Sequence, residues 1–142
     1  MSANPILVIL LFALSTPYLL GKALYFSGTY ISAIQIAKDL DLYTKNWVIF
    51  FLRLHDAVTG LVVAFVLAGV LGFILKSKIF AYVSLYLFLC CITFCFLVLL
   101  DGEPISTLTY TFSNSYSIYS FALCSYAFYW LGSKVKIRPT NE

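Results

Sequence analysis

Charged residues are scarce in this sequence. Only 11% of its 142 residues are Asp, Glu, Lys or Arg, whereas a soluble domain carries about 25%. So little charge cannot cover a water-soluble surface, which excludes an ordinary soluble globular protein. The net charge of +3 is small, and the basic residues are dispersed at the ends of apolar runs. This distribution is typical of a membrane protein and does not favour a nucleic-acid partner.

Metal-ligating residues are also few. His55 is the only histidine, and the four cysteines, Cys90, Cys91, Cys95 and Cys124, all lie inside apolar runs rather than in loops. Cys91 and Cys95 would share one helix face, but no histidine or carboxylate accompanies them. We therefore expect no metal site and no secreted disulfide framework. We interpret the thiols as small apolar packing groups.

The sequence contains long apolar runs. About 20 residues are needed to cross a bilayer core, and four runs reach that length: residues 6–26, 47–75, 79–100 and 112–132. The first run has no Lys or Arg before Lys22 and no clear cleavage site, so we expect a retained helix rather than a signal peptide. Pro17 predicts a kink in it. The predicted fold is an all-α integral membrane four-helix bundle, a single domain over residues 1–142.

The connections differ in length. Residues 76–78 form a turn so short that the second and third spans must be an antiparallel hairpin. Residues 27–46 form the longest connection, which could be a short helix on the outer surface, an extension of the first span or a cap on the bundle. Residues 108–112 alternate as an extended segment does before the fourth span.

The basic residues set the expected orientation. With four crossings, one side of the membrane holds five basic residues and the other holds two: Lys76, Lys78, Lys134, Lys136 and Arg138 against Lys38 and Lys45. Lys22 and Arg53 lie near the boundary, and counting both on the second side makes the comparison five against four. The excess of positive charge favours the cytoplasm. We therefore expect both termini inside, in the inner membrane of a bacterium.

Ionisable residues gather at the head of the second span. Arg53 and Asp56 are spaced i, i+3 and share a helix face, with His55 between them in sequence. If the span begins at Trp47, Asp56 lies about 13 Å along the helix, and a charge at that depth needs a partner. Lys22, near the outer end of the first span, is expected at a similar depth. An intramembrane ionisable cluster is by default a candidate functional site.

Two interpretations of the cluster Lys22, Arg53, His55 and Asp56 stay open. It is either an internal salt bridge that fixes helix register or a site for a ligand or redox group. No residue is assigned a catalytic role. A quinone is a cofactor the cluster could serve, whereas haem held between two histidines would need a second chain.

Small residues recur every fourth position below this cluster: Gly60, Ala64, Ala68 and Gly72. Such spacing lets two membrane helices approach closely. We expect this stripe to pack inside the bundle, and the alternative is a homodimer face. The fourth span is rich in Ser and Tyr, which suits either helix packing or a polar cavity wall facing His55 and Asp56.

With these residues placed, the chain resembles the DoxX-like superfamily of four-span membrane proteins, which includes the MauE-type accessory proteins. A lysine closes the first span in Leu20-Gly21-Lys22, and Asp56 stands four residues before Gly60 in a second span rich in small residues. The cysteine-rich turn of MauE-type members is absent around residues 101–104. The resemblance implies an accessory or subunit role in membrane redox or quinone-linked processes, with Lys22 and Asp56 as the residues carried over.

Three functions remain in view. The first is a non-catalytic accessory protein that binds a partner or a small lipophilic ligand through the outer polar cluster. The second is a quinone-linked redox subunit in which His55 and Asp56 handle protons. The third is an immunity or assembly protein that works through its helix-packing stripe. The expected partners are the lipid bilayer and either another membrane protein or further copies of this chain.

Overall fold

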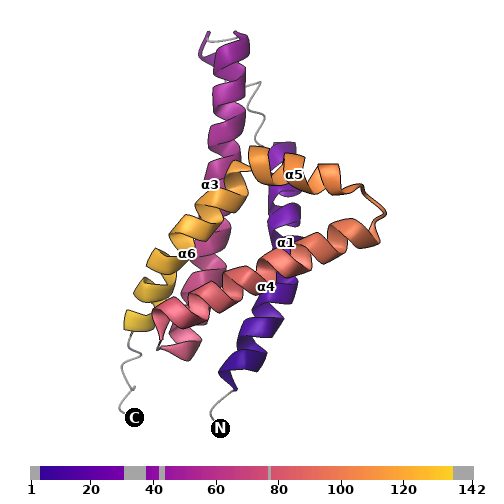
Figure 1. The fold of residues 1–142 in the computed structure, drawn as a ribbon. Coiled ribbons are helices and arrows are strands. Elements are labelled where there is room, and N and C mark those ends of the chain that lie inside the picture. Colours follow the sequence, from indigo (N-terminus) through magenta and orange to yellow (C-terminus); the bar gives the residue numbers. More distant parts are fainter. Residues whose placement is uncertain (1–3, 31–37, 42–43, 77, 136–142) are drawn as a thin grey trace.

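The computed structural model describes residues 4–30, 38–41, 44–76 and 78–135. Its helices are α1 (Pro5–Tyr30), α3 (Lys45–Leu75), α4 (Ile79–Leu100), α5 (Ile105–Asn114) and α6 (Tyr116–Lys134) (Figure 1). The described residues contain no strand, so the predicted all-α class is confirmed. The short outer helix expected between the first two spans falls largely on residues 31–37, which lie outside the described residues.

Among the described residues, three helices are long and apolar enough to cross a membrane: Pro5–Gly28, Asn46–Leu75 and Ile79–Leu100. The chain is therefore an integral membrane protein, as the sequence predicts. Large apolar side chains cover the outward faces of these helices; Phe80, for example, is 79% exposed. Exposed apolar area on this scale matches contact with lipid rather than with water.

The fourth predicted span differs from the structure at its start. Residues 112–114 belong to α5, and α6 begins only at Tyr116, after an extended backbone at Ser115 (φ −90°, ψ 99°). The stretch 108–112 is helical and not extended, so that prediction is wrong. The Ser-Asn-Ser sequence at residues 113–115 favours a helix boundary, because short polar side chains stabilise helix starts. Among the described helices, α6 is also not one of the three with the length and hydropathy of a span.

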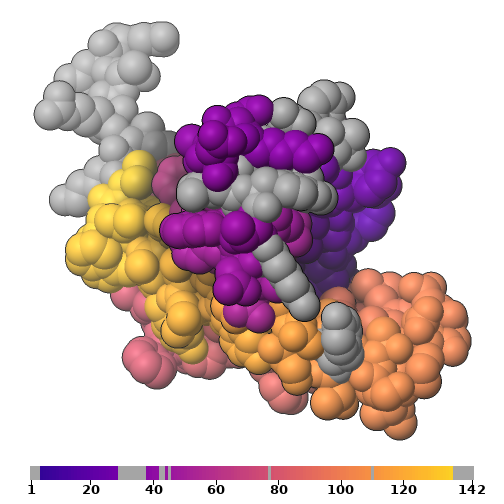
Figure 2. Space-filling view, turned by 90° about the horizontal axis from the view of Figure 1, so that it is seen from above, coloured from indigo at the N-terminus to yellow at the C-terminus, as the bar shows by residue number. Residues whose placement is uncertain are grey.

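The helices form a body of α1, α3 and α6 crossed by α4. In Figure 1, α6 descends beside α3, and α4 runs obliquely across α1. The chain then turns back, and α5 lies above α4 in this view. The start of α1, the turn between α3 and α4, and the end of α6 all lie toward the lower end of that view. Seen from above in Figure 2, α5 and the far end of α4 project to one side of the body. This arrangement leaves a space between α1, α4 and α5.

Buried residues from four helices meet in the centre of the molecule. The Tyr86 hydroxyl of α4 lies 2.7 Å from Oγ1 of Thr16 in α1. The Thr16 hydroxyl donates to the Phe12 carbonyl at 2.7 Å. Tyr86 and Tyr129 of α6 are fully buried. A buried tyrosine hydroxyl needs a partner, and Thr16, next to Pro17, supplies it. These contacts join α1 to α4 at mid-height.

The turn between α3 and α4 places lysines where glycine is preferred. Lys76 ends α3 in the left-handed conformation (φ 53°), and its N–H donates to the Gly72 carbonyl at 2.9 Å. A side chain in this conformation costs about 1–2 kcal/mol, and glycine is the common residue at such a helix end.

Replacing Lys76 by glycine should therefore raise the free energy of unfolding by about 1 kcal/mol. Thermal unfolding in mild detergent measures the effect. Lys134→Gly is the matched control, because it removes the same charge at a helical position where glycine gives no such relief. Equal effects of the two changes would attribute any gain to charge rather than to backbone conformation.

Candidate functional site

Asp56 binds the start of α6. Its Oδ2 accepts a hydrogen bond of 2.9 Å from the backbone N–H of Ser117, the second residue of that helix. The first N–H groups of a helix have no partner within the helix, and the helix dipole makes this end attractive to a negative charge. The side chain of Ser115, the residue before the helix, makes no capping hydrogen bond to it. The carboxylate in the membrane is thus satisfied by a helix terminus.

Other polar contacts join the head of α3 to the start of α6. Ser120 donates its hydroxyl hydrogen to the Ala57 carbonyl at 2.7 Å. The guanidinium of Arg53 lies 5.2 Å from the ring centroid of Tyr116, a cation–π contact. The Ser115 and Ser117 hydroxyls lie 2.9 Å apart. Together these contacts fix where α6 begins and how it meets α3.

The predicted ionisable cluster does not come together. Within the part of the chain that the structure describes, Asp56 forms no ion pair with Arg53 or Lys22. Lys22 is exposed, and its Nζ lies 5.6 Å from the ring centroid of Tyr18 on its own helix. His55 faces α1 instead of α6, beside Ala23 and Ser27 in a groove between α1 and α3. Consecutive helix residues point about 100° apart, which separates His55 from Asp56.

The stripe of small residues lies between α3 and α6. Ala64 and Ala68 are fully buried, and Gly60 and Gly72 are buried beside them. A β-carbon added at Gly60 would collide with the Ser117 backbone, and one added at Gly72 would collide with the Tyr129 backbone. These four residues let the two helix backbones touch inside one chain, so α6 covers the stripe.

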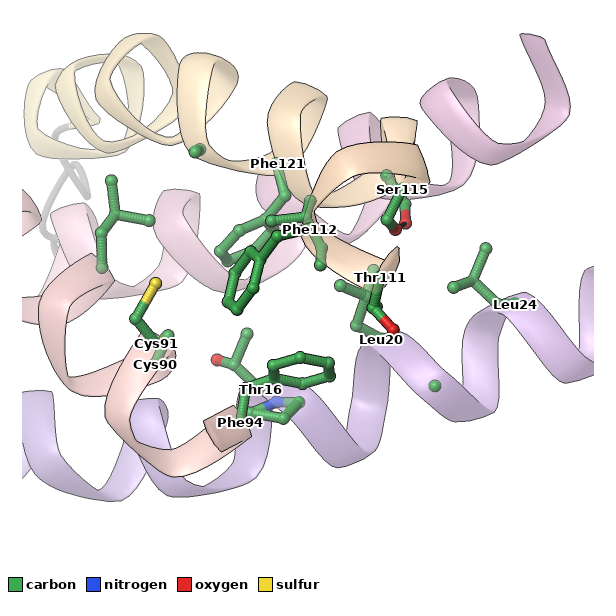
Figure 3. A pocket seen from close by; sticks show the side chains of 16 residues that line it. Thr16, Leu20, Leu24, Cys90, Cys91, Phe94, Thr111, Phe112, Ser115 and Phe121 are labelled. Carbon is green, nitrogen blue, oxygen red and sulfur yellow. Dashed lines mark hydrogen bonds between the residues drawn. The ribbon is translucent and has the colours of Figure 1, made fainter. Parts of the chain in front are cut away.

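An apolar cavity of about 200 Å³ lies beneath α5 (Figure 3). We call it the α5 cavity. Its walls come from four helices and include Thr16 and Leu20 of α1, Cys90 and Phe94 of α4, Phe112 of α5 and Ala122 of α6. Its volume corresponds to roughly seven water-sized groups at about 30 Å³ each. That is room for one segment of an apolar chain.

The polar groups of the α5 cavity are unevenly distributed. In Figure 3, the Thr111 and Ser115 side chains lie at the end nearest Leu24, and the two thiols, Cys90 and Cys91, lie at the opposite end. Phe112 and Phe121 stand between them. Ser117, whose N–H binds Asp56, also lines the cavity. An elongated guest would therefore meet the Thr111 and Ser115 hydroxyls at one end and, toward the other end, the Thr16 hydroxyl and the two thiols.

The four cysteines are free thiols. Cys90 is buried and Cys91 is exposed, while Cys95 and Cys124 are intermediate. No group of three or more His, Cys, Asp or Glu side chains that could hold a metal ion occurs among the described residues.

Sequence reasoning found Asp56 but missed its partner. Ser117 was one of several serines in a polar span, and only the break at Ser115 makes its N–H the free end of a helix. The signal that could have located it is the Ser-Asn-Ser sequence at residues 113–115, which is typical of a helix start. The Thr16–Tyr86 pair had no such signal, because the two residues are far apart in the sequence.

Comparisons with protein families, with curated proteins and with solved structures find no match to this chain. The candidate site therefore rests on its own geometry.

Proposed function

We propose that this chain is a small accessory membrane protein that binds a lipophilic ligand in the α5 cavity. The observation that carries the proposal is the cavity itself: an apolar space with hydroxyls at one end, beside the Asp56–Ser117 contact. Apolar pockets with a few placed polar groups are the usual form of small-molecule sites. A single-chain amphiphile fits this pattern, with its polar end toward Thr111 and Ser115.

The proposed topology has four crossings with both termini in the cytoplasm of a bacterium. At 1.5 Å per residue, the 19 residues of α6 extend about 28 Å, which is close to the roughly 30 Å thickness of a bilayer core. The ends of α1 and α6 that would face the cytoplasm lie toward the same end of the molecule. The basic excess on that side supports the orientation.

The two alternative functions have less support. A quinone-linked redox role, which the DoxX-like resemblance implies, would use Lys22 and Asp56, but Lys22 contacts Tyr18 and Asp56 binds Ser117. An assembly role through the small-residue stripe would need that stripe on the outside, and α6 covers it. A partner membrane protein or a second copy would contact other faces of the helices.

Filling the α5 cavity should abolish ligand retention. Ala122 lines the cavity, so Ala122→Phe places a ring where the ligand would lie. Ala127 is exposed on the same helix, and Ala127→Phe adds the same bulk outside the cavity. Native mass spectrometry of protein purified in mild detergent should detect a discrete bound lipophilic molecule in the wild type and in Ala127→Phe, and at least about tenfold less in Ala122→Phe. Equal occupancy in all three proteins would contradict the assignment.

A further inference from the structure

A second cavity lies between α1 and α3. It has a volume of about 450 Å³ and separates the C-terminal half of α1 from the N-terminal half of α3. We call it the His55 groove. Ala23 and Phe26 of α1 face Phe51, Val58 and Val62 of α3 across it, and His55 forms part of its wall. It shares no lining residue with the α5 cavity.

One polar atom in this groove has no partner. Nε2 of His55 is buried and makes no hydrogen bond within the part of the chain that the structure describes. The two hydroxyls nearby are already used: Thr59 donates to the His55 carbonyl at 2.9 Å, and Ser27 donates to the Leu24 carbonyl at 3.3 Å. Buried polar atoms in folded proteins are nearly always hydrogen-bonded. Because Nε2 has almost no accessible surface, a molecule in the groove would supply the missing partner after a rotation of the imidazole ring toward it.

The surroundings of His55 indicate an uncharged head group. Arg53 lies against Tyr116 and Lys22 lies against Tyr18, and neither cation lines the groove. Among the described residues, no Lys or Arg lines the groove, so a carboxylate or phosphate there would be desolvated without a permanently charged side chain beside it. Asp56 is directed to α6 and bound to Ser117, so an ammonium head would have no counter-ion there either. A hydroxyl can donate to or accept from an imidazole nitrogen, so it suits either histidine tautomer.

We infer that the His55 groove is a binding site for an uncharged, hydroxyl-headed lipid. The hydroxyl bonds to Nε2 of His55, and the apolar chain lies along Val58 and Val62 between Phe26 and Phe51. The groove opens to the lipid-exposed side of α3, where Val58 is 50% exposed. A ligand can thus enter laterally from the bilayer. This site is independent of the α5 cavity, and the two sites are tested by separate experiments.

The test compares three photoreactive probes that differ only at the head. Each probe has a chain of about 16 carbons, enough to span about half a bilayer, with a diazirine in its tail. One probe is the alcohol, one is its methyl ether and one is the fatty acid. The purified full chain is placed in phosphatidylcholine nanodiscs and irradiated. Mass spectrometry then measures labelling of α1 and α3 peptides around the groove. If Nε2 accepts the bond, the alcohol should label these peptides up to about tenfold more than the ether, which corresponds to about 1.4 kcal/mol. If Nε2 donates the bond, both probes should label these peptides, and both should lose labelling in His55→Phe.

Variants separate the head-group bond from simple packing. His55→Phe keeps a planar ring without hydrogen-bonding nitrogen, and it should label equally with alcohol and ether. His55→Asn keeps a donor and an acceptor, so the alcohol preference should persist and serves as the test if His55→Phe does not fold. Val58→Trp fills the groove and should reduce labelling by every probe. Val66→Trp, on the same helix outside the groove, should leave labelling unchanged.

Three results would overturn the inference. Labelling by the alcohol that is the same in the wild type and in His55→Phe would mean that His55 does not bind the head group. An alcohol preference that persists in His55→Phe would place the bond elsewhere. Strongest labelling by the fatty acid would indicate an anion site instead of a site for an uncharged lipid.

Discussion

Gly72→Ala should lower the free energy of unfolding by about 1–3 kcal/mol, although alanine is the better helix former. The added β-carbon would collide with the backbone of Tyr129, and backbone cannot move aside as a flexible side chain does. Overpacking of a tight contact costs about 1–3 kcal/mol, which exceeds the gain of about 1 kcal/mol from replacing glycine in a helix. Unfolding of the purified protein in mild detergent, followed by circular dichroism, measures the change.

Gly69→Ala is the matched control, three residues away on the same helix. A β-carbon at Gly69 would come no closer than 3.9 Å to the Phe128 carbonyl, an ordinary contact. We therefore expect Gly69→Ala to be neutral or to raise the free energy of unfolding by up to about 1 kcal/mol. Gly132→Ala should behave like Gly72→Ala, because its β-carbon would collide with the Gly69 backbone. If Gly72→Ala and Gly69→Ala have the same effect, the helices α3 and α6 are not in backbone contact.

Asp56→Ala should lower the free energy of unfolding by about 1–2 kcal/mol and loosen the start of α6. The change removes the acceptor of the Ser117 N–H, and the loss of a side-chain cap costs about 0.5–2 kcal/mol. A carboxylate at the positive end of the helix dipole adds a contribution of its own. Hydrogen exchange at residues 116–118 measures the local effect, and thermal unfolding measures the global one.

Asp56→Asn separates the two contributions. The asparagine carbonyl still accepts the Ser117 N–H but carries no charge. We expect the loss of unfolding free energy in Asp56→Asn to be less than half of the loss in Asp56→Ala. Hydrogen exchange in the first turn of α6 should become faster only in Asp56→Ala. Unchanged exchange at Ser117 in Asp56→Ala would show that the carboxylate does not cap this helix. Ligand retention in both variants would then report whether the cap shapes the α5 cavity.

Composition and periodicity predict the long apolar helices well. Nothing competes with helix formation in residues 47–75 or 79–100, because in lipid the backbone must satisfy its own hydrogen bonds. The helix break at Ser115 is not predicted by hydropathy, because a hydropathy average over a span hides the polar residues that cause the break. The N–H of Ser117, just after the break, binds Asp56, which lies 61 residues earlier in the sequence, and no local pattern contains that contact.

The candidate site shows the same limit. The sequence identifies Arg53, His55 and Asp56 as unusual residues for a membrane helix, and their spacing suggests mutual pairing. The structure directs Asp56 and Arg53 to α6 and His55 to α1. Which neighbour each side chain meets depends on how α1, α3 and α6 are arranged around one another, and helical spacing alone does not contain that information. The α5 cavity likewise is lined by residues of α1, α4, α5 and α6 that lie far apart in the sequence.

Cross-linking from inside the α5 cavity would decide whether it holds a specific molecule. A photoreactive phenylalanine analogue replaces Phe112, which lines the cavity, or Leu123, which is 78% exposed on the lipid-facing side of α6. Membranes are irradiated before any detergent is added, and the adducts are identified by intact-protein mass spectrometry. We predict one discrete lipophilic adduct at position 112 and the mixed bulk phospholipids at position 123. The same mixture of bulk phospholipids at both positions would contradict a ligand-binding cavity beneath α5.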